Sequence, residues 1–217
     1  MLTSETWQTM TYTELVAAAK LYADRQDIEV NDSMDIFILM AEARVNRVLK
    51  TREQSTRAYT LTIEDKEYYP LPPDYSGMRD VQINSDLPTE EHKNTKLSYI
   101  SPELFNTVRG KPYCGSSYYC VIANQIQIFP LQEEGKTIEM VYWQKVPNLN
   151  LTDSTNWLSE SHPDIYLAGI VAEIEIFAKN YDVASKWDSK MSRSISELDE
   201  SDVKENWSGS QLVTRIG

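Results

Sequence analysis

Thr155-Asn156-Trp157-Leu158-Ser159-Glu160-Ser161-His162-Pro163-Asp164 divides the chain into two parts with different patterns. Before this stretch, apolar and polar residues alternate as they do in strands, whereas after it apolar residues recur every three or four positions, as in helices. Ser161 and His162 are candidate caps of a helix. Pro163 suits the first turn of that helix, and Asp164 places an anion at its positive end. We therefore expect a helical segment to begin here.

Two helices are predicted after this stretch, over residues 163–180 and 182–200, and they form a helical hairpin. The apolar stripe of the first contains Ile165, Ala168, Gly169, Ala172 and Ile176, and that of the second contains Trp187, Met191, Ile195 and Leu198. Residues 201–217 are mostly polar and form a predicted C-terminal tail. Such tails are usually disordered alone, and its few apolar residues predict that it becomes ordered on a partner.

Two more helices are predicted near the N-terminus, over residues 11–26 and 32–51. Thr11 and Glu14 have the spacing of a capping box at the start of the first. In the second, the expected core-facing stripe contains Phe37, Met40, Ala41, Val45 and Val48, with Glu42, Asn46, Arg47 and Lys50 on the other side. A basic cluster begins in the second half of this helix and continues past its end, and it contains Arg44, Arg47, Lys50, Arg52 and Arg57. The cluster is either a solvated helix face or a contact with an acidic neighbour.

The middle of the chain, residues 57–147, has the pattern of about five or six short strands. Pro70, Pro72 and Pro73 force extended or edge structure within it. Because both ends of the chain are helical, they can pack together and leave the strands as an insertion. The predicted fold class is therefore α+β, with a helical bundle from the N- and C-terminal helices, an inserted antiparallel β lobe and an extended C-terminal tail. We expect one domain over residues 1–200 and the tail over 201–217.

Composition limits the classes of function. The chain has 217 residues and a net charge of −12, which argues against a protein that wraps nucleic acid, because phosphate contacts need a basic face. No run of ~18 apolar residues is present, so no transmembrane helix is expected. The N-terminus lacks the pattern of a signal peptide, and we expect synthesis in a cytoplasm. Cys114 and Cys120 are too few for a disulfide framework and lack zinc-site spacing.

The sequence has no recognisable catalytic motif. It contains no P-loop, GxGxxG or GxSxG pattern, and the two histidines, His92 and His162, read as a loop residue and a helix-start residue. Adjacent carboxylates are common but none stands out as the acid–base pair of a glycosidase. We therefore expect no enzyme activity, no cofactor and no metal.

Tyrosine is unusually frequent, with 13 Tyr against 4 Phe. Many of these residues fall in the predicted β lobe, among them Tyr68, Tyr69, Tyr118 and Tyr119. Amphipathic rings are typical of interfaces, although ordinary packing of a sheet also accounts for part of the set. The lobe is therefore a candidate partner-binding surface.

The order of several segments resembles the head-to-tail adaptor (connector, or tail tubular adaptor-like) proteins of tailed bacteriophages. Tyr69-Pro70-Leu71-Pro72-Pro73-Asp74-Tyr75 followed by Met78-Arg79-Asp80-Val81 is similar to a YxLPxDYxxxxxV segment of that family. Further similar segments are residues 97–105, 125–130, 138–147, 156–158 with 163–169, and 184–198. The resemblance covers roughly residues 11–199, and it lies in the order and spacing of the segments.

The resemblance implies a structural virion protein at the head–tail junction, assembled in the host cytoplasm. It implies a ring, usually of about 12 copies, that lies beneath the portal protein and carries tail or nozzle proteins. DNA would pass through the lumen without specific binding, and no membrane is involved. A peptidoglycan-degrading virion hydrolase, or a module that binds a host or other partner through the Tyr-rich lobe, stays open as an alternative.

Site residues follow from the same resemblance. The expected ring-interface residues are Arg44, Arg47, Lys50 and Arg52, which would pair with acids of neighbouring copies. The expected portal contacts lie in the tail and are Trp207, Leu212, Val213, Arg215 and Ile216. The expected contacts of the lobe with a tail partner are Tyr68, Tyr69, Tyr118 and Tyr119.

Overall fold

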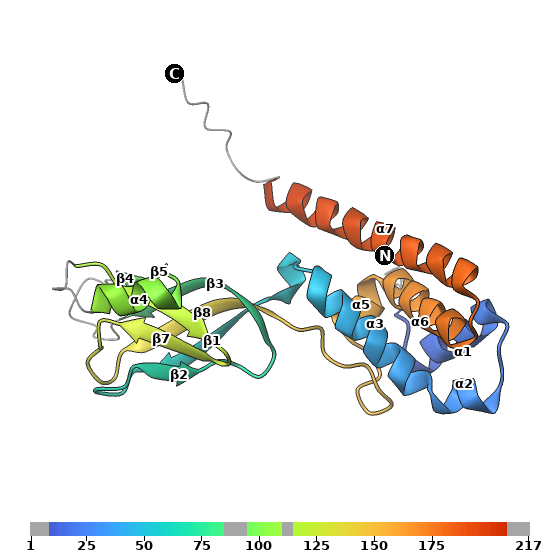
Figure 1. Cartoon of the computed structure of the whole chain (residues 1–217), viewed down its shortest axis with the longest axis horizontal. Coiled ribbons are helices and arrows are strands. Elements are labelled where there is room, and N and C mark those ends of the chain that lie inside the picture. Colours follow the sequence, from blue (N-terminus) through green and yellow to red (C-terminus); the bar gives the residue numbers. More distant parts are fainter. Residues whose placement is uncertain (1–8, 85–94, 110–114, 208–217) are drawn as a thin grey trace, which may run out of the picture. The chain divides into compact units, whose positions relative to one another are not determined.

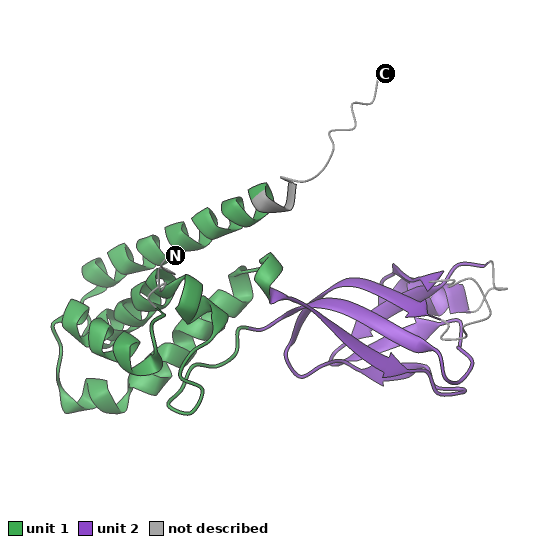
Figure 2. Cartoon of the chain, turned by 180° about the vertical axis from the view of Figure 1, so that it is seen from behind, with its two compact units in different colours: residues 1–53, 146–217 green, residues 54–145 purple. Residues whose placement is uncertain are grey.

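The computed structural model describes residues 9–84, 95–109 and 115–207. The chain forms two compact units, coloured separately in Figure 2. Unit 1 contains both ends of the chain, residues 1–53 and 146–217, and unit 2 contains residues 54–145. The predicted α+β fold, with a β lobe inserted between N- and C-terminal helices, is therefore confirmed.

Figure 1 labels the elements in chain order. The helices are α1 (Tyr12–Ala23), α2 (Ile28–Asp32), α3 (Met34–Val48), the 3-10 helix η1 (Arg52–Gln54), α4 (Pro102–Arg109), α5 (Trp157–Ser161), α6 (Pro163–Phe177) and α7 (Tyr181–Trp207). The strands are β1 (Ser55–Leu61), β2 (Tyr68–Pro70), β3 (Tyr75–Asn84), β4 (Thr95–Lys96), β5 (Ser98–Tyr99), β6 (Tyr118–Ile122), β7 (Gln125–Phe129) and β8 (Thr137–Gln144).

Helix α6 is the centre of unit 1, because α1, α3 and α7 all pack against it. A helix that is apolar on nearly every side is typically buried, and α6 buries most of its residues. Gly169 makes the close packing possible: a Cβ built there would lie 2.9 Å from Ala41 Cβ of α3 and 3.2 Å from Met191 of α7. Glycine therefore sets how closely three helices approach.

Capping explains where several helices begin. Thr11 and Glu14 form the predicted capping box at the start of α1. Pro163 occupies the first turn of α6 as expected, but His162 at the N-cap position makes no capping bond with its side chain. The cap in this stretch is Asn156, which forms a reciprocal box with Ser159 at the start of the separate helix α5.

Several helix boundaries differ from the predicted ones. The first helix stops at Ala23 instead of 26, because Asp24 adopts a left-handed φ of 50°. The predicted 32–51 helix covers only Met34–Val48, and the 163–180 helix ends at Phe177. Helix α7 continues past 200 to Trp207, so residues 201–207 are helical and not part of an extended tail. In this last part of α7, the Asp202 carboxylate accepts a hydrogen bond from the Arg52 backbone N–H at 3.0 Å.

Unit 2 contains eight strands within the described residues, more than the five or six expected, in two four-stranded sheets. The orders are β1-β8-β3-β4 and β2-β7-β6-β5. All pairs are antiparallel as predicted except β5–β6, which is parallel. Residues of both sheets share one core: Tyr69, Leu71, Val81, Ile83, Leu97, Tyr119, Ile126, Ile128, Ile138 and Met140. The strands span 55–144, close to the predicted lobe of 57–147.

Candidate functional site

Helix α3 is apolar on two opposite faces. Its buried face contains Met34, Phe37, Ile38, Ala41, Glu42 and Val45. The opposite face, called here the outer face of α3, contains Ile36, Leu39, Met40, Ala43 and Arg47. Ile36, Leu39 and Met40 remain 53%, 56% and 49% exposed. Exposed contiguous apolar side chains of this kind mark interaction sites.

The predicted orientation of this helix is partly wrong. Met40 and Val48, which were expected in the core, are exposed, and Glu42, which was expected outside, is buried. The helix carries more apolar residues than one face can hold, so more than one set of them has helical spacing. The predicted core-facing stripe is therefore rotated about the helix axis relative to the buried face in the structure. Packing against α6 decides which residues turn inward.

Glu42 is the centre of a buried polar network in unit 1. Its Oε1 accepts hydrogen bonds from the Leu149 backbone N–H at 2.7 Å and from the Tyr166 hydroxyl at 2.9 Å. Asn156 Nδ2 in turn donates to the Tyr166 hydroxyl and to the Pro147 carbonyl, both at 2.7 Å. Burial raises the pKa of Glu42, and the two bonds that it accepts oppose that rise. The network joins α3, α6 and residues 147–156.

The four basic residues of the expected ring interface have different surroundings. Arg44 forms an ion pair with Asp188 and donates to Ser192 Oγ at 3.1 Å, both on α7 of its own chain. Lys50 and Arg52 are exposed beyond the end of α3. Arg47 is exposed on the outer face of α3 and has no ion-pair partner among the residues described. Arg47 is therefore the member of the set best placed to meet another molecule.

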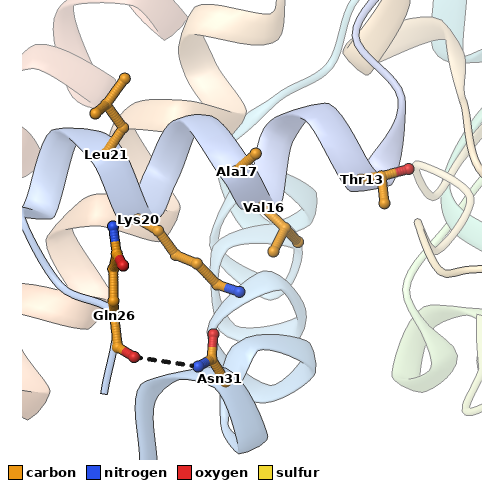
Figure 3. Close-up of a pocket in the computed structure, with 7 residues that line it drawn as sticks. All are labelled: Thr13, Val16, Ala17, Lys20, Leu21, Gln26 and Asn31. Carbon is orange, nitrogen blue, oxygen red and sulfur yellow. Dashed lines mark hydrogen bonds between the residues drawn. The ribbon is translucent and has the colours of Figure 1, made fainter. Parts of the chain in front are cut away.

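An open hollow of about 650 Å³ lies beside α1 (Figure 3). Its lining residues are Thr13, Val16, Ala17, Lys20, Leu21, Gln26 and Asn31. Leu21 is 77% exposed, and the Asn31 side chain donates to the Gln26 carbonyl at 3.4 Å. Lys20 is the only charged residue among the described residues that line it, so these residues do not form the paired acid and base of a catalytic cleft. Its exposed leucine suits contact with an apolar surface.

The four tyrosines of the predicted lobe contact separate into two pairs. Tyr69 is 2% exposed, and its hydroxyl accepts from the Ile63 N–H at 3.2 Å and donates to the Lys66 carbonyl at 3.1 Å. Tyr119 is also buried in the core of unit 2. Tyr68 is exposed and Tyr118 half-buried. Side-chain alternation along β2 and β6 explains the difference, and it removes Tyr69 and Tyr119 from the accessible surface.

Chemically reactive groups are sparse in the described parts of the chain. Within residues 9–84, 95–109 and 115–207, no three His, Cys, Asp or Glu side chains are placed to hold a metal ion. The Cys120 thiol is buried, donates to Gln127 Oε1 at 3.3 Å, and has its pKa raised by burial. A thiol with a raised pKa is a poor nucleophile. His162 is half-buried at the α5–α6 junction, and His92 and Cys114 lie outside the described residues.

No helix within the described residues has both the length and the apolar character that a bilayer crossing needs.

The predicted portal contacts lie at or beyond the C-terminal end of the described residues. Trp207 is the last residue of α7, and its side chain lies outside what the structure describes, as do Leu212, Val213, Arg215 and Ile216.

The exposed face of α3 and the Glu42 network were both missed from the sequence. The signal for the first was present, because Ile36, Leu39, Met40 and Ala43 have helical spacing of their own.

Comparison with protein families finds a family model that matches nearly the whole chain. The family model described as "SU10 adaptor protein" matches residues 10–215. No curated protein matches the chain.

Proposed function

The chain belongs to the SU10 adaptor protein family of phage head–tail adaptors, and from this premise we propose that its copies form a closed ring between the capsid portal and the tail. Family membership makes the protein a structural component of a virion that contacts head and tail proteins. The proposed ring contains about 12 copies, as the resemblance of the sequence implies, and its lumen extends the DNA channel.

The outer face of α3 is the observation that supports a ring best. Three large apolar side chains there are about half exposed in the single chain, and Arg47, which has no ion-pair partner in the described part of the chain, follows them on the same face. An apolar face with a charged edge has the composition of a protein interface. In this proposal Arg47 makes the ring contact, Lys50 and Arg52 flank it, and Arg44 supports α3 within its own chain.

The charge of the chain supports a channel through which DNA passes without binding. The net charge is −12, so a ring of such chains presents DNA with a surface that repels phosphates at short range. A sequence-specific or wrapping protein needs the opposite, a basic face. The acidic composition therefore favours passage of the DNA.

Two further contacts complete the proposal. The C-terminal residues Leu212, Val213, Arg215 and Ile216, with Trp207, bind the portal, and Tyr68 and Tyr118 of unit 2 contact the next tail component. A structural family and the lack of a recognisable catalytic motif favour a non-enzymatic role. Zymography on peptidoglycan with the purified protein checks this, and a clear lysis band at the mass of the chain would favour the hydrolase alternative.

Native mass measurement tests the ring. The purified chain, 25.0 kDa, should remain a monomer or weak oligomer alone and form a closed multi-copy ring when it is mixed with tailless heads that contain the portal. Failure of the full-length chain to bind those heads would refute the proposal.

A truncation tests the portal contact separately. It should remove residues 208–217 only, because residues 201–207 belong to α7 and Asp202 holds the Arg52 backbone. The truncated chain should keep the melting temperature of the full chain and lose binding to heads. Undiminished binding would show that the tail does not carry the portal contact.

A further inference from the structure

Two helix faces of unit 1 have matching residue spacing. On the outer face of α3, Arg47, Ala43 and Met40 follow each other at intervals of four and three residues. On α1, Glu14, Ala17 and Leu21 follow each other at intervals of three and four, and this set is called here the outer face of α1. At 1.5 Å rise per residue, the charged and the apolar end of either face are about 10.5 Å apart.

The charged ends of the two faces are complementary. Arg47 has no ion-pair partner among the described residues, and Glu14 is exposed on α1. Both hydrogen bonds that Thr11 donates to Glu14 reach Oε2, at 2.8 Å, so the structure records no bond to Oε1. These bonds also lower the pKa of Glu14, which keeps its carboxylate charged. One face thus offers a free cation and the other an anion.

The centres and the apolar ends also fit. Ala43 and Ala17 are both exposed at the middle of their faces, and two opposed alanines let helices approach at the shorter end of the usual 8–10 Å. Leu39 and Met40 project from α3, and Leu21, one of the residues that line the hollow, projects from α1 on the side away from Lys20 (Figure 3). The apolar ends of the two faces can therefore pack against each other.

We infer that α3 of one copy packs antiparallel across α1 of the next copy, with Arg47 beside Glu14, Ala43 opposite Ala17, and Leu39 and Met40 over Leu21. The contact joins two different surfaces of the same chain, so each copy uses α3 toward one neighbour and α1 toward the other. A heterologous contact of this kind repeats from copy to copy, and it closes into a ring when the rotation between neighbouring copies completes a full turn. The inference rests on the proposed function, because it specifies which surfaces form that ring.

Disulfide cross-linking of the full chain, bound to tailless portal-containing heads, tests the pairing. In a Cys114→Ser background, the double variant Ala17→Cys/Ala43→Cys places one thiol on each face, at the position where the two helices come closest. Mild oxidation should then join each copy to both neighbours and give a ladder of multimers on a denaturing gel. Three matched controls should give no ladder: either single variant, and Ala17→Cys combined with Ser185→Cys on the exposed surface of α7.

A second variant measures the contact without cross-linking. Leu39→Glu places a charge in the middle of the apolar contact and should weaken multi-copy assembly on the heads about tenfold or more. Because Leu39 is exposed in the single chain, the Leu39→Glu variant should keep the melting temperature of the wild type. Ser185→Glu is the matched surface control and should assemble as the wild type does.

The outcomes separate this inference from the proposed function. A ladder that extends beyond the dimer supports the α3–α1 contact. Bound multi-copy protein without cross-links, or normal assembly of Leu39→Glu, overturns the contact and leaves the ring proposal standing. A ladder that stops at the dimer overturns the head-to-tail arrangement in favour of a two-fold pair. A wild-type chain that does not bind heads overturns both.

Discussion

Replacing Glu42 by alanine should destabilise the helical unit strongly. The substitution removes the one oxygen that accepts from both the Leu149 N–H and the Tyr166 O–H, at 2.7 and 2.9 Å. Each buried donor left without an acceptor costs about 1–3 kcal/mol, so the two together cost about 2–6 kcal/mol. That is a large part of the free energy of unfolding of a typical domain, about 5–15 kcal/mol.

Glu42→Gln is the matched control, because glutamine keeps an acceptor oxygen in the same place and removes the charge. It should cost about 1 kcal/mol or less at neutral pH. It should also change the pH dependence. Burial raises the pKa of Glu42 in the folded state, so between the ordinary pKa and the raised one the folded chain binds more protons than the unfolded chain. The stability that this proton contributes is complete below the ordinary pKa and is lost as pH rises through the raised one.

Urea unfolding of the three chains, followed by tryptophan fluorescence, measures these differences. As pH rises from the ordinary pKa of a glutamate through the raised pKa of Glu42, the wild type should lose stability relative to Glu42→Gln, because only the wild type has a titratable group at position 42. Amide hydrogen exchange at Leu149 should accelerate in Glu42→Ala and stay slow in Glu42→Gln. Equal losses in the two variants, or unchanged exchange at Leu149 in the alanine variant, would refute the reasoning.

Three further substitutions test the packing. Gly169→Ala should destabilise the helical unit by about 1–3 kcal/mol, although alanine has the better helix propensity, because the new Cβ would lie 2.9 Å from Ala41 Cβ. Thermal melts of this variant and of Gly169→Ala/Ala41→Gly measure the effect, and a single variant more stable than the wild type would contradict it. Arg44→Ala should lower the stability by only about 0.2–1 kcal/mol, and by less at high salt, because the ion pair of Arg44 with Asp188 is partly exposed. A double-mutant cycle with Asp188→Ala measures the coupling energy, and a salt-independent value above that range would contradict the prediction. Tyr69→Phe should destabilise unit 2 by about 0.5–1.5 kcal/mol, because the hydrogen bonds of the Tyr69 hydroxyl are lost. Urea unfolding followed at Trp143 would detect this loss of stability, and an unchanged midpoint would count against those bonds.

Signals confined to a few neighbouring residues could be read from the sequence. The Thr11–Glu14 capping box and Pro163 in the first turn of α6 both occur where they were predicted. Each depends on backbone geometry and side chains within about four residues, so no distant contact is needed to specify it. The order of such segments along the chain was also enough to indicate the adaptor family, which the match over residues 10–215 confirms.

The sequence by itself therefore determined the fold class, many element positions and the family, whereas tertiary packing decided which side chains face inward. Apolar spacing in α3 is compatible with two opposite faces, and the choice between them follows from contact with α6, where Gly169 leaves room for Ala41 that a Cβ at position 169 would take. The same choice buries Glu42 against Leu149 and Tyr166, more than a hundred residues away in the chain. It also leaves Leu39 and Met40 exposed, with Arg47 on the same side, because a helix that turns one apolar face to its core must turn the other outward.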